Sequence, residues 1–143
     1  RVAQAAAGLS RLDVQPTHIL SSPLVRAVET AKIAHHLLRI RTTVRIVDEL
    51  LPHASPNRLL SILHDLPPES CVLCVGHEPH LGIVASVFLS GRASASFPLK
   101  KAGACLIELS TPAKPGHGLL RWWLTPSQLR AIGKRRTAMK DEG

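Results

Sequence analysis

Apolar residues along the chain follow two spacings, and the alternation between them predicts the architecture. Short apolar runs rich in β-branched residues predict strands at about 17–20, 44–47, 71–75, 103–109 and 119–124. Apolar positions three or four residues apart predict helices at about 1–12, 24–38, 55–63, 79–89 and 126–132. Strands that alternate with helices indicate an α/β fold, and the turn 111–118 makes the last two strands an antiparallel hairpin.

The run Cys71–Val75 is apolar at every position, which is typical of a strand covered on both faces in a parallel sheet. We therefore expect a three-layer α/β/α sandwich, with a mostly parallel sheet, an antiparallel C-terminal hairpin and this strand buried on both faces. A chain of 143 residues is long enough for one domain with a core. We assign residues 1–133 to that domain and residues 134–143 to a basic C-terminal tail.

The formal net charge of +8 favours anionic partners. Nucleic acid is an unlikely partner, because aromatic residues suited to base stacking make up only 3% of the chain. Membrane partners are not expected either, since no apolar run approaches the roughly 20 residues that span a bilayer. Without a recognisable signal peptide, the sequence predicts a cytoplasmic protein.

The three cysteines do not predict a metal centre or a disulfide framework. Cys71 and Cys74 form a C-x-x-C pattern, but an offset of three along a strand sends the two sulfurs to opposite faces. An odd number of cysteines in apolar segments is also unlike a secreted disulfide scaffold. We expect buried thiols, with no metal and no cofactor.

A candidate anion site follows the first predicted strand, in the segment Ser21–Ala31. Here a polar corner leads into a helix that carries Arg26 in its first turn, where backbone N–H groups and a guanidinium can bind an oxyanion together. From position alone, Arg26 could instead be solvated or paired with Glu29. Ser22 could add a hydrogen bond to the anion, or it could cap the helix.

A second polar corner, Gly76–His77, follows the strand at 71–75. Ligands bind at the carboxyl ends of the strands in an open α/β sheet, so the two corners are expected to converge. His77 would then donate hydrogen bonds to phosphoryl oxygens, although a lone histidine at a strand end is often a packing residue. We expect Glu78, His80 and His53 at the rim of this pocket.

The segments Ser21-Ser22-Pro23-Leu24-Val25-Arg26-Ala27-Val28-Glu29-Thr30-Ala31 and Val75-Gly76-His77-Glu78-Pro79-His80-Leu81 resemble motifs of the histidine phosphatase superfamily. The branch that the chain most resembles is the SixA-like phosphohistidine phosphatases, which have a phosphoglycerate mutase-like fold. This resemblance extends to residues 119–129, which look like the closing strand and helix of SixA-like proteins. It therefore covers essentially the whole chain.

The resemblance implies metal-independent hydrolysis of phosphohistidine on a protein, through a phosphohistidine enzyme intermediate. It implies that Arg26 and His77 bind the phosphoryl group and take part in catalysis, with Ser22 as a further phosphate-binding residue. Glu49 lies where many relatives carry the acid that protonates the leaving group, although a loop ion pair is an equal alternative. The partners implied are a phosphorylated protein or a small phosphoester, and inorganic phosphate.

The nucleophile that the resemblance calls for is missing from these residues. It belongs to an Arg-His-Gly motif after the first strand of the family, and this motif does not occur in the sequence. We therefore expect an N-terminally truncated, inactive and poorly soluble chain, with the missing motif about 20 to 30 residues upstream of Arg1. The alternative is a non-catalytic phosphate-binding or protein-interaction module of the same fold.

Overall fold

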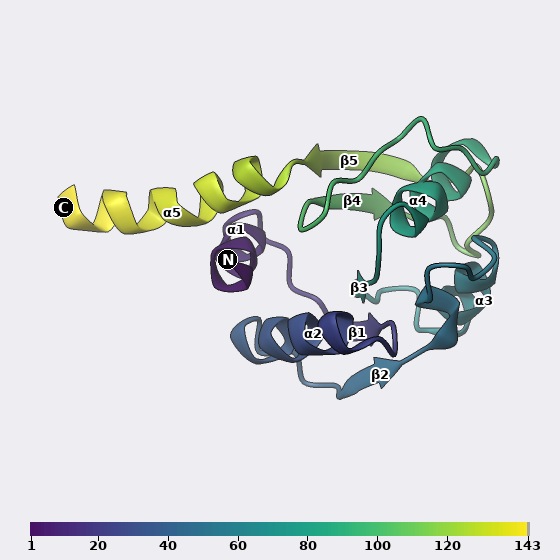
Figure 1. Ribbon diagram of the computed structural model, residues 1–143, viewed down its shortest axis with the longest axis horizontal. Coiled ribbons are helices and arrows are strands. Elements are labelled where there is room, and N and C mark those ends of the chain that lie inside the picture. Colours follow the sequence, from purple (N-terminus) through teal and green to yellow (C-terminus); the bar gives the residue numbers. More distant parts are fainter. Residues whose placement is uncertain (143) are drawn as a thin grey trace.

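The computed structural model describes residues 1–142, and the side chains of residues 1–134 (Figure 1). Helices are α1 (Val2–Arg11), α2 (Val25–Leu37), α3 (Arg58–Asp65), α4 (His80–Ser90) and α5 (Pro126–Glu142), with a short 3₁₀ turn η1 (Asp48–Leu50). Strands are β1 (His18–Ser21), β2 (Val44–Ile46), β3 (Val72–Val75), β4 (Ala104–Glu108) and β5 (Leu119–Leu124).

The strands form two sheets, one parallel and one antiparallel. The parallel sheet has the order β2-β1-β3, with Ser21 paired to Ile46 on one side and to Val75 on the other. β4 and β5 form an antiparallel hairpin that does not share backbone hydrogen bonds with the parallel strands in the described residues. The predicted α/β class, parallel sheet and C-terminal hairpin are confirmed.

Alternating side chains of β1 serve two cores on opposite faces of the parallel sheet. Ile19 packs with Ala31 and Ala34 of α2, whereas Leu20 packs with apolar residues of α3 and α4. Ile19 and Leu20 are each only 1% exposed. This alternation places helices on both faces of β1, as expected for a strand with period-two side-chain direction.

β3 is less buried than the sequence predicts. All four of its residues are only partly buried, whereas Ile19, Leu20 and Ser21 of the neighbouring strand are buried. Side chains of β3 pack against a core on both faces of the sheet, as expected, but they are not fully buried. β3 pairs with β1 on one edge only, and no strand covers its other edge among the described residues. A continuous apolar run predicts the strand but does not determine its neighbours.

Two glycines bring α1 and α5 into close contact beside the sheets (Figure 1). A Cβ added at Gly8 would collide with the backbone carbonyl of Leu129, and one at Gly133 would collide with that of Gln4. Helix backbones can approach this closely only where the side chain is a hydrogen atom. The N-terminal helix is thereby packed against the C-terminal one.

Two helices differ from their predicted limits. α3 begins at Arg58 rather than at residue 55, and α5 continues to Glu142 rather than ending near residue 132. The predicted basic tail therefore begins within α5, and its side chains from residue 135 onward lie outside the described residues, as does Gly143. Within residues 1–142, no helix is both long enough and apolar enough to cross a bilayer.

Candidate functional site

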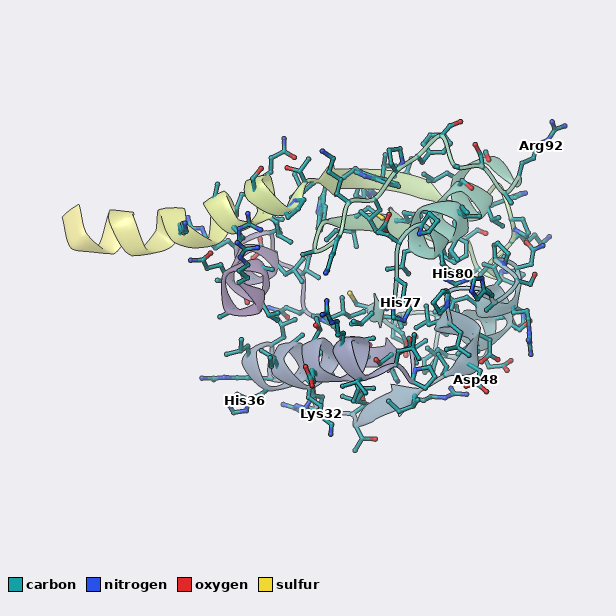
Figure 2. The ribbon with its side chains drawn as sticks, in the orientation of Figure 1. Lys32, His36, Asp48, His77, His80 and Arg92 are labelled. Atoms are coloured by element: carbon teal, nitrogen blue, oxygen red, sulfur yellow. The ribbon has the colours of Figure 1, made fainter. Side chains whose placement is uncertain are left out.

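The two polar corners predicted to converge lie side by side at the carboxyl ends of β1 and β3. Ser21 is the register partner of Val75, and the backbone N–H of Ser22 donates to the carbonyl of Val75 at 2.9 Å. The parallel pairing therefore continues one residue beyond β1. It ends just before the turn that contains His77 and leads into α4. Figure 2 shows His77 at this end of β3.

A side-chain contact joins the corners directly. The Ser22 Oγ and the His77 Nε2 are 2.7 Å apart, across a sequence separation of 55 residues. Ser22 is completely buried, and its Oγ also accepts the N–H of Leu24 at 3.2 Å. Leu24 is the N-cap residue of α2, so the hydroxyl stabilises the entrance of the helix rather than its first turn. A contact between Ser22 and an anion stays a prediction.

Arg26 is the second residue of α2 and is exposed to solvent. Among the described residues, its guanidinium forms no hydrogen bond or ion pair, and the alternative partner Glu29 does not pair with it. The first turn of α2 carries no acidic residue. A positive side chain beside the N–H groups of a helix N-terminus, with no acidic side chain to compete, is a favourable environment for an anion.

The absence of a side chain at Gly76 lets the β3–α4 corner approach the η1 loop. A Cβ at this position would lie 3.3 Å from the Leu81 Cγ and 3.5 Å from the Leu50 carbonyl oxygen. The carbonyl of His77 accepts the N–H of Leu81 at 2.9 Å, which fixes the start of α4 relative to the histidine. His77 itself is half-buried, so one part of its ring remains accessible.

Glu49 lies within η1, next to the Leu50 carbonyl that faces Gly76. Its side chain is half-buried, and it takes part in no ion pair within the described part of the chain. The loop ion pair offered as its alternative role is therefore not found. Its role as a proton donor stays a prediction.

His80 is buried behind the corner rather than exposed at a pocket rim, so that expectation was wrong. Its Nε2 donates to the Ala54 carbonyl at 3.1 Å, which ties the first residue of α4 to the loop after η1. Burial, together with the nearby His77, lowers the pKa of His80 despite this hydrogen bond. The Nδ1 of His80 is buried without a partner among the described residues. In contrast, Glu78 and His53 are exposed. The protein still removes some of the water around the Glu78 carboxyl, and this partial desolvation raises its pKa.

The cysteines are free and partly buried. Burial raises the pKa of Cys74 to about 12 and that of Cys105 to about 11, so both are protonated at neutral pH. Since the thiolate is the reactive form, neither thiol is a nucleophile under ordinary conditions. The described residues contain no cluster of three or more His, Cys, Asp or Glu side chains suited to a metal ion.

Comparison with known protein sequences identifies one relative by similarity. An uncharacterized protein of Picosynechococcus sp. is 32% identical over 97 residues, which make up 66% of this chain and 58% of the relative. The chain thus spans less than two thirds of the length of this curated relative. No protein-family model matches the chain.

Comparison with solved structures identifies the fold. The structure of the protein histidine phosphatase SixA complexed with tungstate has a TM-score of 0.77 at 22% identity, covering 90% of this chain and 80% of that one. SixA of Agrobacterium tumefaciens has a TM-score of 0.66 at 20% identity, covering 87% and 78% of the two chains. SixA of Nakamurella multipartitia has a TM-score of 0.56 at 18% identity, covering 87% and 80%. The chain has the SixA fold over most of its length, as the sequence motifs predicted.

Proposed function

We propose that this chain forms the phosphate-binding part of a phosphohistidine phosphatase, in which Arg26 and His77 hold the phosphoryl group of a phosphorylated protein. The observation that carries the proposal is the contact between Ser22 and His77, because it brings the two predicted motifs together at 2.7 Å on a SixA fold. A SixA structure with tungstate, a tetrahedral oxyanion like phosphate, supports this choice of ligand.

The reaction that fits these groups is a two-step phosphoryl transfer without a metal. A histidine nitrogen of the enzyme attacks phosphorus while the P–N bond to the substrate histidine breaks, and water then cleaves the phosphoenzyme to release inorganic phosphate. Arg26 stabilises the charge on the equatorial oxygens, and His77 donates a hydrogen bond to one of them. The leaving imidazole can be protonated by water on its own ring nitrogen and departs as a neutral molecule, so this substrate needs less help from Glu49 than a phosphoester does.

The nucleophile of this reaction would come from outside the 143 residues, since they contain no Arg-His-Gly motif. The edges of β3 and β4 without a strand partner in the described residues offer a place for one more strand of the whole protein, with its carboxyl end near Ser22 and His77. Sequencing the coding region upstream of Arg1, together with the intact mass of the native protein, tests this part of the proposal. A different residue in place of the nucleophile would leave a non-catalytic phosphate-binding module.

Tungstate and phosphate binding by calorimetry tests the pocket in the 143-residue chain. We expect Arg26→Ala and His77→Ala each to weaken binding roughly tenfold to a hundredfold, because each removes a hydrogen bond to a charged group. Arg92→Ala and His36→Ala are matched controls, since both residues are exposed and lie away from His77 in Figure 2. Equal affinity in all four variants would contradict the assignment of the pocket.

In the whole protein, Arg26→Ala and His77→Ala should each lower the turnover of a phosphohistidine peptide by orders of magnitude while the fold stays intact. Unchanged turnover in either variant would remove that residue from the catalytic set. Binding of phosphate without any turnover would favour the non-catalytic module instead.

A further inference from the structure

The Ser22 hydroxyl has a single hydrogen, so it cannot donate to an anion and to His77 at the same time. A hydroxyl carries one hydrogen to donate and two lone pairs to accept with. One lone pair accepts the Leu24 N–H at 3.2 Å, and the His77 Nε2 lies 2.7 Å away. Because Ser22 is completely buried, bulk water cannot supply a partner for the remaining hydrogen.

These contacts determine the proton arrangement of neutral His77. A buried hydroxyl hydrogen without an acceptor costs free energy, and Nε2 is the acceptor that the described residues place next to Ser22. The hydroxyl therefore donates to Nε2, which must be unprotonated in neutral His77. The ring proton of the neutral imidazole is then on Nδ1.

Protonation of the imidazole does not remove the hydrogen on Nδ1. In the cation both ring nitrogens carry hydrogen, and Nε2–H can donate to the second lone pair of the Ser22 Oγ, whose own hydrogen then loses Nε2 as its acceptor. Nδ1 keeps its hydrogen in both charge states. An N–H donor is therefore present on the side of the ring away from Ser22 in both charge states.

We infer that Ser22 is a positioning residue: its hydroxyl occupies Nε2 of His77, so that Nδ1–H is the ring group that binds the phosphoryl oxygen. This inference rests on the proposed function for the identity of the ligand. Ser22 then acts on the anion through His77, in place of the direct phosphate contact predicted from the sequence. The same hydroxyl fixes the entrance of α2, so the helix that carries Arg26 and the histidine ring share one anchor.

The tautomer of His77 can be measured by ¹⁵N NMR of the histidine-labelled 143-residue chain, with His77→Gln to assign the signal. We expect the neutral ring to carry its proton on Nδ1 in the unsubstituted chain. Ser22→Ala should abolish this preference and raise the Kd for tungstate about tenfold, which corresponds to about 1.4 kcal/mol. Ser22→Thr, which restores the hydroxyl, should recover both properties.

Ser21→Ala is the matched control, because Ser21 is equally buried but its hydroxyl donates to the Ser22 carbonyl at 2.9 Å rather than to His77. It should leave the His77 tautomer and the Kd unchanged. A neutral His77 protonated on Nε2 in the unsubstituted chain would overturn the inference, and so would an unaltered tautomer in Ser22→Ala. Failure of the unsubstituted chain to bind tungstate would count against the proposed function instead, while the tautomer would still decide the role of Ser22.

Discussion

β1 and β3 are neighbouring strands of equal length in one sheet and both end at the candidate site, yet the entirely apolar β3 is the less buried of the two. Ile19 and Leu20 are 1% exposed, while every residue of β3 is only partly buried. Within residues 1–142, β1 has a neighbouring strand on each side and β3 has one neighbouring strand. Strand composition therefore reports what a segment can bury, while the number of neighbouring strands decides how much of it is buried.

The exits of the two strands differ as well. After β1, the Ser22 hydroxyl binds both the start of α2 and His77. After β3, Gly76 allows the Leu50 carbonyl and the Leu81 side chain to come close, and the buried His80 binds the next loop. One corner is held by side-chain hydrogen bonds, and the other by close packing and one buried histidine.

The largest expected effect comes from shortening one leucine in each strand. Leu20→Ala removes a side chain that is 1% exposed, and should lower the free energy of unfolding by about 3–5 kcal/mol through lost burial and a cavity. Leu73→Ala removes a partly buried leucine of β3, and should cost roughly half as much because solvent already reaches it. Urea unfolding of both variants measures the difference.

Equal losses for the two leucines would contradict the comparison, since they would mean that β3 is as well covered as β1. The same two variants test the comparison of β1 with β3 further in the whole protein. If a further strand pairs with β3 there, as we propose, the cost of Leu73→Ala should rise toward that of Leu20→Ala.

The elements and the meeting of the two motifs could be predicted from the sequence, because both depend on local signals. Apolar runs identified β1 and β3, and parallel strands bring their carboxyl ends to one edge. The bond between Ser22 and His77 could not be predicted, since it depends on a register of Ser21 with Val75 that no local pattern specifies. The burial of His80 was missed for the same reason, because its partner Ala54 lies in a separate loop.

A smaller effect is expected when a methyl group is added to the exit of β3. In Gly76→Ala, the new Cβ would lie 3.3 Å from the Leu81 Cγ, which is tighter than ordinary packing. We expect a loss of about 1 kcal/mol, measured by urea unfolding. The double variant with Leu81→Ala should show coupling, because the atoms that meet the new methyl are then gone. Additive losses would mean that the corner is not held by this contact.

The smallest effect concerns pH, and it isolates His80. Its pKa is lowered below the ordinary value of 6.5, mainly by burial, so the folded chain favours the neutral ring. As the pH falls through 6.5 toward the lowered pKa, the unfolded chain gains a proton that the folded chain does not, and stability decreases. Above 6.5 the contribution of His80 to stability is fully present.

His80→Gln keeps a side-chain N–H donor for the Ala54 carbonyl but cannot titrate. It should therefore flatten the dependence of the free energy of unfolding in urea on pH between about 7.5 and 5.5. His36→Gln, at an exposed position on α2, should leave it unchanged. If His80→Gln retained the full slope, the ring at the exit of β3 would have to be as accessible to protons in the folded chain as in the unfolded one, and the contrast between the two corners would fail there.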